Sequence, residues 1–327
     1  MGWCSFFYAA PMRFLFLLFM LFGLAGRPAS AQLISGTIRD AATQAALPYV
    51  NIGVVGKDLG TVSTEAGAYQ LVFRETLAND TVRISSMGYQ TRLLTLRTLL
   101  GQPNIALASG SVALQEVQVR GRNVFRRALT LGNTSNSLTS NLNLNTKDLG
   151  AEIGTVISIK RHPTRVLSAN FNISYNKVGP LTFRVNFYQL DARGRPTEVK
   201  LLAHDVLVTS DIKTGTISVD LTNERLVVEE DFFLALEWIK NKENAGPAGQ
   251  PAHSTKFRAS VSKSPTSSGA PVAPPQPQDL AFSLSVGYVN NDLYLRSTSQ
   301  AAWERASVGA ILLGMQPRLS FYVTVND

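Results

Sequence analysis

The histidines are the first residues to test for catalytic chemistry, because a hydrolytic zinc site needs several of them at a fixed spacing. A zinc peptidase holds its metal with a His-x-x-Glu pair and a distant third histidine, and it keeps one ligand position open. None of the histidines in this chain is followed three residues later by an acid. The spacing therefore predicts no metal site, and we expect all three at the surface or at strand ends: His162, His204 and His253.

Other catalytic constellations are equally weak in this sequence. There is no G-x-S-x-G motif, and the one cysteine is Cys4. The acids 229–231 precede an apolar segment, so we interpret them as the beginning of a strand rather than as a glycosidase pair. The Asn-Asn-Asp cluster at 290–292 offers calcium ligands, but a hairpin turn explains it better. We expect no catalytic residue, no metal and no cofactor.

Aromatic side chains of the second half are the better candidates for binding a ligand. Exposed aromatic rings stack on ligands, but large aromatic residues more often fill a core. Trp238 follows Leu234 and Leu236 at every second position, which predicts a core residue. A tryptophan in a short polar segment, Trp303, is the more exposed candidate. The candidate ligand-binding residues are Trp303, Tyr294, Tyr288 and Trp238.

The elements that would position these side chains are strands. Apolar and polar residues alternate in the second half, which places one set of side chains in a core and the other in water. These alternating segments are 167–176, 181–188, 216–221, 282–286 and 319–325. Turn residues separate further strand candidates in the first half, at 33–39, 48–55, 68–74, 80–86, 91–97 and 112–120. Many short strands with short turns predict antiparallel β-sandwiches.

The sequence divides into two predicted domains. Residues 121–148 are rich in Asn, Ser and Thr, and we interpret them as a polar linker. The predicted fold is all-β, with one antiparallel β-sandwich at 33–120 and a second, jelly-roll-like one at 149–327. Within the second domain, residues 262–279 are rich in Pro and Ser and predict a disordered insertion between strands.

The N-terminal residues predict export. Arg13 precedes the apolar run 14–24, and the small residues Ala29-Ser30-Ala31 follow it. A basic residue, a short apolar segment and an A-x-A ending are typical of a secretory signal peptide. We expect residues 1–31 to be removed, although an uncleaved membrane anchor is the alternative. The mature chain would then begin at Gln32 and, without Cys4, contain no disulfide.

The charge of the chain argues against a nucleic-acid partner. The net charge is +8, and removal of the two arginines of the signal segment leaves 8 − 2 = +6. The basic residues are spread singly rather than in blocks of five or six, which indicates a solvated surface. We expect no nucleic-acid partner and no small-molecule cofactor.

Four sequence blocks carry a family resemblance. They are SGTIRD at 35–40, LPYVNI at 47–52, GTVSTEAGAY at 60–69 and DTVRISSMGY at 80–89. In this order and spacing they resemble the carboxypeptidase-regulatory-like domain over about residues 33–120. The resemblance implies a transthyretin-like sandwich of about seven strands that serves in folding or docking. It implies no catalytic position.

The second half has a looser resemblance. Segments 187–190, 219–221, 231–238 and 299–304 are similar to C-terminal β-sandwich regions of Bacteroidetes envelope proteins that carry the same N-terminal domain. That resemblance implies no assigned activity.

These features favour an exported, non-enzymatic binding, adhesion or interaction module of the cell envelope. Its expected location is the periplasm, the outer membrane or the cell surface, and its expected partner is an envelope protein or a glycan. Two alternatives stay open. Residues 114–119, LQEVQV, resemble the stretch that follows this domain in TonB-dependent uptake systems, which would make the chain a component or relative of one. The second domain could also form a small outer-membrane β-barrel.

Overall fold

The computed structural model describes most of the predicted strand-bearing segments. The described residues are 32–110, 125, 127–138, 140–144, 149–240, 280–288, 292–306 and 315–327. The predicted signal peptide 1–31, the predicted insertion 262–279, the predicted strand 112–120 and residues 114–119 lie outside the described residues. Among the helices described, none is long and apolar enough to cross a membrane.

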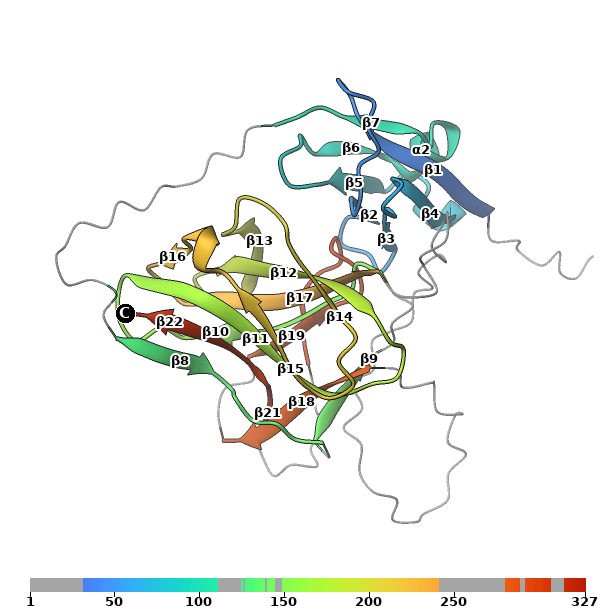
Figure 1. Cartoon of the computed structure of the whole chain (residues 1–327). Helices are drawn as coiled ribbons and strands as arrows, with labels where there is room; N and C mark the ends of the chain where they lie inside the picture. The colour runs from blue at the N-terminus through green and yellow to red at the C-terminus, as the bar shows by residue number, and fades with distance from the viewer. Residues whose placement is uncertain are drawn as a thin grey trace, which may run out of the picture. The chain divides into compact units, whose positions relative to one another are not determined.

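Strands β1–β7 form two sheets, drawn in blue to teal in Figure 1. One sheet has the order β4-β1-β7 and the other has the order β3-β2-β5-β6. The strands are β1 (Gln32–Asp40), β2 (Asn51–Val54), β3 (Gly60–Val62), β4 (Ala68–Phe73), β5 (Thr81–Ser85), β6 (Arg92–Thr95) and β7 (Ile105–Leu107). The described pairings within the second sheet are antiparallel, but β1 and β7 run parallel, which corrects the expectation of purely antiparallel sheets.

The core of this sandwich comes from the residues that the alternation predicts to point inward. Val82 and Ile84 of β5 are fully buried, and so is Ile38 of β1. A helix interrupts the predicted strand 91–97, because the Thr95 side chain accepts a hydrogen bond from the Thr98 backbone N–H and begins α2 (Leu96–Gly101). A short 3₁₀ turn, η1 (Glu75–Leu77), joins β4 to β5.

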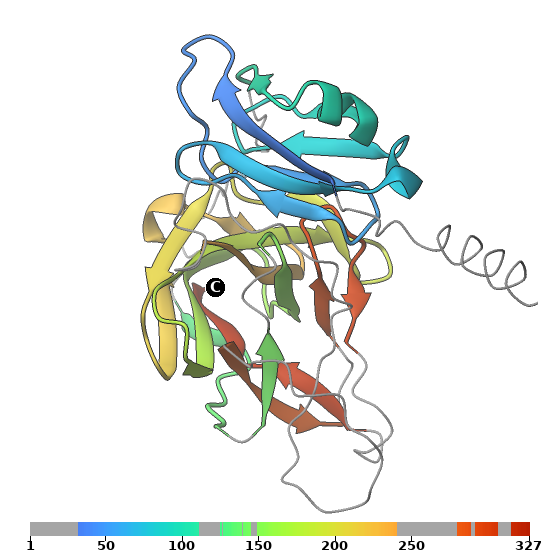
Figure 2. The same cartoon turned by 90° about the vertical axis from the view of Figure 1, so that its right-hand side faces the viewer.

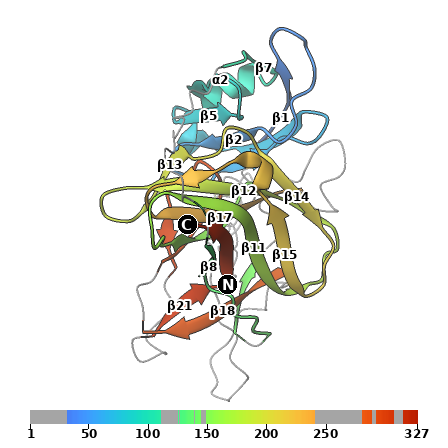
Figure 3. The ribbon, with the colours of Figure 1, turned by 60° about the vertical axis from the view of Figure 1, so that its left-hand side comes forward.

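The second half forms two larger sheets. A seven-stranded sheet has the order β13-β12-β17-β10-β19-β20, and β14 also pairs with β12. An eight-stranded sheet has the order β21-β18-β11-β22-β8. In this second sheet, β15 and β16 also pair with β11, and β9 pairs with β18. Figure 3 shows β12, β17 and β11 in this region. The seven-stranded sheet contains β10 (Glu152–Ile157), β12 (Leu181–Leu190), β13 (Pro196–Lys200), β14 (Val206–Ser210), β17 (Phe232–Lys240), β19 (Leu293–Arg296) and β20 (Glu304–Arg305). The eight-stranded sheet contains β8 (Ala128–Gly132), β9 (Asn141–Leu144), β11 (Thr164–Asn176), β15 (Gly215–Asp220), β16 (Val227–Val228), β18 (Leu280–Gly287), β21 (Gln316–Leu319) and β22 (Phe321–Asn326), and η2 (Thr222–Glu224) joins β15 to β16.

The predicted linker 121–148 is wrong for two of its segments, because β8 and β9 belong to the eight-stranded sheet. β8 pairs with β22, and β9 pairs with β18, as Figure 2 shows for the green β9 beside the red-orange strands. Leucines alternate with the polar residues of these two strands, and Leu131, Leu142 and Leu144 lie in the core. In β9, Asn141 Nδ2 donates to Leu138 O at 3.1 Å, and the Tyr175 hydroxyl donates to Asn143 Oδ1.

The two halves have separate apolar cores. One joins buried residues from Ile34 to Leu107, and the other joins residues of the two larger sheets, with Val62 as its one member from β1–β7. The predicted all-β fold built from sandwich layers is confirmed by these sheets. The jelly-roll-like arrangement stays a prediction, and so do the domain boundaries apart from the linker segments that form β8 and β9.

Candidate binding cleft

The outer face of the seven-stranded sheet carries a row of charged residues. Arg184 of β12 pairs in register with Glu237 of β17, which pairs with Glu152 of β10, which pairs with Arg296 of β19. All four side chains are buried. Like charges directly opposite on neighbouring strands are destabilising, so the two central carboxylates depend on the flanking arginines. We call these four residues the charge row.

Arg184 joins the charge row to the first sandwich. Its Nη1 donates to Glu237 Oε2 at 2.8 Å, and its Nε forms an ion pair with Asp205 Oδ1 at 3.1 Å. Its Nη2 donates to the backbone carbonyl of Tyr49 at 2.5 Å, and Nη1 reaches Asn51 Oδ1 at 3.4 Å. A charge-assisted hydrogen bond to a carbonyl is stronger than a neutral one. The guanidinium therefore has partners in both halves of the chain.

Arg296 has a matching set of partners at the other end of the row. Its Nη2 donates to Glu152 Oε1 at 2.6 Å, and its Nη1 reaches both carboxylate oxygens of Glu198 at 2.8 and 3.0 Å. The guanidinium carbon lies 4.1 Å from the centre of the Trp303 ring, a cation–π arrangement. Tyr188 OH donates to Glu152 Oε2 at 2.9 Å. Arg296 therefore neutralises two carboxylates at once.

Burial and charge act differently on the two central carboxyl groups. Burial raises the pKa of Glu152 above its usual range, and Arg296 offsets only part of that rise. Burial also acts to raise the pKa of Glu237, but Arg184 and Lys200 outweigh it, so its pKa is lowered. The charges around Glu237 therefore favour its ionised form, whereas burial disfavours the ionised form of Glu152. Burial, followed by Glu152, raises the pKa of Tyr188 well above its usual value.

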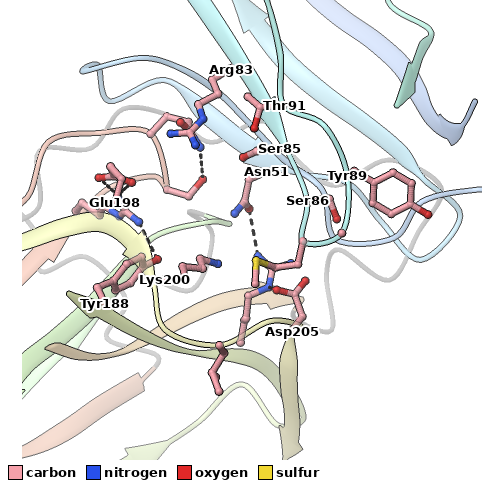
Figure 4. Close-up of a pocket in the computed structure, with 17 residues that line it drawn as sticks. Asn51, Arg83, Ser85, Ser86, Tyr89, Thr91, Tyr188, Glu198, Lys200 and Asp205 are labelled. Carbon is pink, nitrogen blue, oxygen red and sulfur yellow. Dashed lines mark hydrogen bonds and ion pairs between the residues drawn. The ribbon is translucent and has the colours of Figure 1, made fainter. Parts of the chain in front are cut away.

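A cavity of about 260 Å³ opens beside the charge row. One wall comes from β12, β13 and the segment after β13, and the other from β5 and the turn that follows it (Figure 4). Arg184, Tyr188 and Arg296 form part of its lining. The other lining residues are Asn51, Arg83, Ser85, Ser86, Met87, Gly88, Tyr89, Thr91, Glu198, Lys200, Leu202, Asp205, Ser299 and Gln300.

Lys200 is a cation of this cavity that makes no direct ion pair among the described residues, although its charge helps to lower the pKa of Glu237. The other charged groups of the same wall are engaged, because Arg184 holds Asp205 and Arg296 holds Glu198. Among the described residues, the Lys200 ammonium makes no hydrogen bond or ion pair, and it lies 5.9 Å from the centre of the Tyr188 ring. Figure 4 shows its amine directed into the cavity. Burial, together with Arg184, lowers its pKa.

The turn that forms the opposite wall is fixed by the motif residues of the first sandwich. Gly88 has a φ of +79°, a conformation that glycine adopts readily. Tyr89 OH donates to Asp40 Oδ2 at 3.1 Å, and Asp40 Oδ1 accepts from the backbone N–H groups of Ala42 and Thr43 at 2.8 Å. These hydrogen bonds lower the pKa of Asp40, the two backbone ones most. The Asp and Gly-Tyr motifs therefore hold the cavity turn in place.

The four predicted ligand-binding aromatics lie in different environments. Trp238 and Tyr294 are buried, which confirms the core interpretation of Trp238, while Tyr288 is 78% exposed. Trp303 is half-buried rather than exposed, because it packs edge-on against Phe233 at 4.9 Å and under Arg296. None of the four lines the cavity, although Trp303 supports Arg296, which does.

One member of the charge row carried a signal in the sequence. Glu237 interrupts the apolar segment 232–239, whereas Arg184 takes a polar position of the alternating segment 181–188. A single charge within an apolar strand indicates a buried, paired group. The pairing itself could not be read from the sequence, since it depends on the register of four strands.

The structure describes only part of the remaining candidate sites. His162 and His204 are exposed, while His253 lies outside the described residues. Asp231 Oδ1 accepts from the backbone N–H of Ile159 at 2.9 Å, at the beginning of β17. No group of three His, Cys, Asp or Glu that could hold a metal ion occurs among the residues that the structure describes. The 290–292 cluster lies partly outside them.

Comparison with known proteins assigns the first sandwich. Residues 34–119 match the family described as the CarboxypepD_reg-like domain. This segment is a carboxypeptidase-regulatory-like β-sandwich, as the four sequence blocks predicted, and the C-terminal domain has no assigned family. No curated protein matches the chain.

Two solved structures are weakly similar to the chain. One contains the cysteine protease and lectin-like domains of Cwp84, a surface-layer-associated protein of Clostridium difficile, with a TM-score of 0.33 and 12% identity over 54% of this chain and 32% of that one. The other is a clostridial Cwp84 variant after propeptide cleavage, with a TM-score of 0.32 and 10% identity over 90% of this chain and 70% of that one. This chain thus spans about a third of the length of the first.

Proposed function

We propose that the protein is an exported, non-enzymatic binding module of the cell envelope, and that its ligand occupies the cavity beside the charge row. The observation that carries the proposal is the cavity itself, whose lining combines a lysine that makes no direct ion pair among the described residues with the side chains of Ser85 and Ser86. Ligand sites combine a concave surface with a few convergent polar groups and perturbed pKa values.

The carboxylates and serines of the cavity lining support binding rather than catalysis. A general base must be free to take a proton, whereas both carboxylates of the cavity lining are held by buried arginines, Glu198 by Arg296 and Asp205 by Arg184. The serine hydroxyls of the described lining have no histidine beside them in that lining. Such a site orients and holds a polar ligand.

Export is the second component of the proposal and rests on the predicted signal peptide. N-terminal sequencing of the mature protein is expected to begin at or within a few residues of Gln32. Retention of Met1 on membrane-bound protein would contradict it.

A ligand screen with a cavity-filling variant tests the binding proposal. Purified protein is screened by thermal shift against sugars, amino acids, short peptides and organic acids, because a ligand that binds only the native state raises the melting temperature. Ser86→Trp fills the cavity and is expected to abolish every shift. Val286→Trp, at an exposed position of β18 outside the cavity lining, is the control and is expected to keep the shifts.

Two outcomes would contradict the proposal. One is a set of ligands whose shifts are the same for the native protein and for folded Ser86→Trp. The other is a screen in which no compound of any class changes the melting temperature.

A further inference from the structure

The cavity continues into a second hollow on the same sheet face. Arg83 and Thr91 line both the cavity and a shallow groove of about 690 Å³. The groove is completed by Val55, Lys57, Asp80, Thr81 and Leu93. The two hollows therefore adjoin at Arg83 and Thr91, and we call the pair of them the track along β5 and β6.

The register of β5 and β6 explains why the track is aliphatic at its outer end. Arg83 pairs with Leu93, so both side chains lie on the face opposite the buried Val82 and Ile84. Leu93 is 62% exposed, and Val55 is 49% exposed. Two exposed aliphatic side chains beside a polar cavity are a surface that a ligand can cover.

Charge defines the inner end of the track. The carboxylates of the cavity wall are paired with Arg184 and Arg296, so the Lys200 ammonium makes no direct ion pair among the described residues, and Glu237 and Asp205 act on it only through longer-range electrostatics. Arg83 lies on the opposite wall (Figure 4). A carboxylate placed between these two cations would satisfy the lysine.

We propose that the cavity binds the free C-terminal carboxylate of an extended polypeptide at Lys200, and that the preceding residues of that polypeptide lie along β5 and β6 over Val55 and Leu93. This inference rests on the proposed function and names the ligand class of the same cavity.

The lining favours a peptide over a sugar. Sugars commonly stack on flat aromatic rings, and the described lining of the groove has none. The two tyrosines of the cavity lining hold protein carboxylates through their hydroxyls, Tyr89 to Asp40 and Tyr188 to Glu152. The aliphatic side chains of the groove suit peptide side chains. The side-chain amides of Asn51 and Gln300 line the cavity and can bond a peptide backbone. A cavity of about 260 Å³ is just below the usual size of a small-molecule pocket, which suits a chain end.

Paired peptide pools test the proposal directly. The full mature chain is immobilised and exposed to a randomised pentapeptide pool with free carboxyl termini, and then to the same pool with terminal amides. Retained peptides are identified by mass spectrometry and resynthesised in both forms. We expect retention from the free-acid pool, and at least about tenfold weaker binding of each peptide as its amide, the size of one lost charge-assisted contact.

Variants of Lys200 test whether the terminal carboxylate of the peptide binds at this side chain. Lys200→Met is expected to weaken the free-acid peptides about tenfold, and Lys200→Arg, which keeps the charge, is expected to retain most of the affinity. Lys213→Met, on an exposed segment between β14 and β15, is the control and is expected to change nothing.

Equal retention of the two pools, no retention from either, or unchanged affinity of Lys200→Met would overturn the inference. The Ser86→Trp variant distinguishes a failure of the carboxylate inference from a failure of the proposal that the cavity binds a ligand. If it abolishes retention of acids and amides alike, the cavity binds ligands but not through a carboxylate. If it leaves retention unchanged, both proposals fail.

Discussion

At the scale of single residues, the charge row stabilises the fold only while it is complete. Glu237 is fully buried, and its Oε1 atom has no hydrogen-bond partner among the described residues. A buried ion pair contributes little net stability, but removal of one partner leaves an uncompensated charge in a low-dielectric site. The ion pair of Arg184 with Glu237 therefore contributes little net stability. Its main effect is to prevent an uncompensated buried charge on Glu237 next to Glu152.

The first prediction concerns this arginine. Arg184→Met is expected to lower the free energy of unfolding by about 3–5 kcal/mol, the usual effect of breaking a buried pair. The double variant Arg184→Met/Glu237→Leu is expected to recover most of that loss. Urea denaturation followed by circular dichroism measures both changes.

The exposed pair Arg97–Glu75 serves as the control for this prediction. Its side chains are largely exposed, so Arg97→Met is expected to change the free energy of unfolding by at most about 1 kcal/mol. A similarly small effect for Arg184→Met would show that Glu237 is not buried as a charged group.

The second prediction concerns the loss of folding stability that results from burying the charged side chain of Lys200. Its native pKa is lowered by burial and by Arg184, so the unfolded chain holds this proton more tightly than the native one. The stability of the native protein therefore rises as pH climbs through the lowered native pKa towards 10.5. Without ligand, Lys200→Met is expected to be more stable than the native protein at pH 7, and the difference is expected to shrink in alkali. Denaturation midpoints between pH 7 and 10 measure it, and a less stable variant at pH 7 would indicate a structural lysine.

At the scale of elements, small residues make room for the rings beside the charge row. Gly154 lies in register between Ala235 and Tyr294, and a Cβ added to it would meet the Phe233 ring at 2.6 Å and Leu234 O at 2.4 Å. Overpacking of this kind forces backbone shifts. The glycine therefore sets the spacing at which Phe233 can pack with Trp303 over the sheet.

The third prediction tests this spacing. Gly154→Val is expected to lower the free energy of unfolding by about 1–3 kcal/mol or more, although valine favours strands. Phe233→Ala in the same chain is expected to relieve part of the clash, so the two changes are expected to be non-additive in a double-mutant cycle. Independent, additive losses would contradict the packing described here.

The sequence predicted the elements whose periodicity is regular and missed those that depend on pairing partners. The alternation in β11 and β12 was plain, because polar and apolar residues change places at every step. β8 and β9 were missed because their polar residues are Thr and Asn, which also favour loops. The binding cleft was missed for a different reason. Arg184 and Asn51 are 133 residues apart, and only the folded chain brings them together.

At the scale of the whole molecule, the two sandwiches have separate cores but meet through specific contacts. A Cβ added to Gly60 would lie 2.9 Å from Thr298 Cβ, and the backbone N–H of Gly56 donates to Gln300 O at 2.8 Å. Ser297 Oγ donates to Asp58 Oδ1 at 2.6 Å. The segment 297–300 thus contacts the β2–β3 hairpin, and two of its residues, Ser299 and Gln300, also line the cavity.

The fourth prediction concerns this contact. Gly60→Ala is expected to lower the free energy of unfolding by about 1–3 kcal/mol and to weaken ligand binding, because the displaced segment carries Ser299 and Gln300. Gly101→Ala, at the end of α2, has no atom within 4 Å of the added Cβ and serves as the control. Thermal denaturation and the ligand screen measure the two effects, and a change in stability without any change in binding would separate the contact from the cavity.

The central claim is that ligand binds in the cavity between the turn after β5 and the wall formed by β13 and the segment that follows it. Hydrogen–deuterium exchange with and without the most stabilising compound of the screen tests it most directly, because exchange reports local opening of the backbone. The account predicts protection concentrated in residues 83–91 and 198–205, and its loss in Ser86→Trp. Protection confined to other segments, such as the neighbourhood of Tyr288, would contradict it.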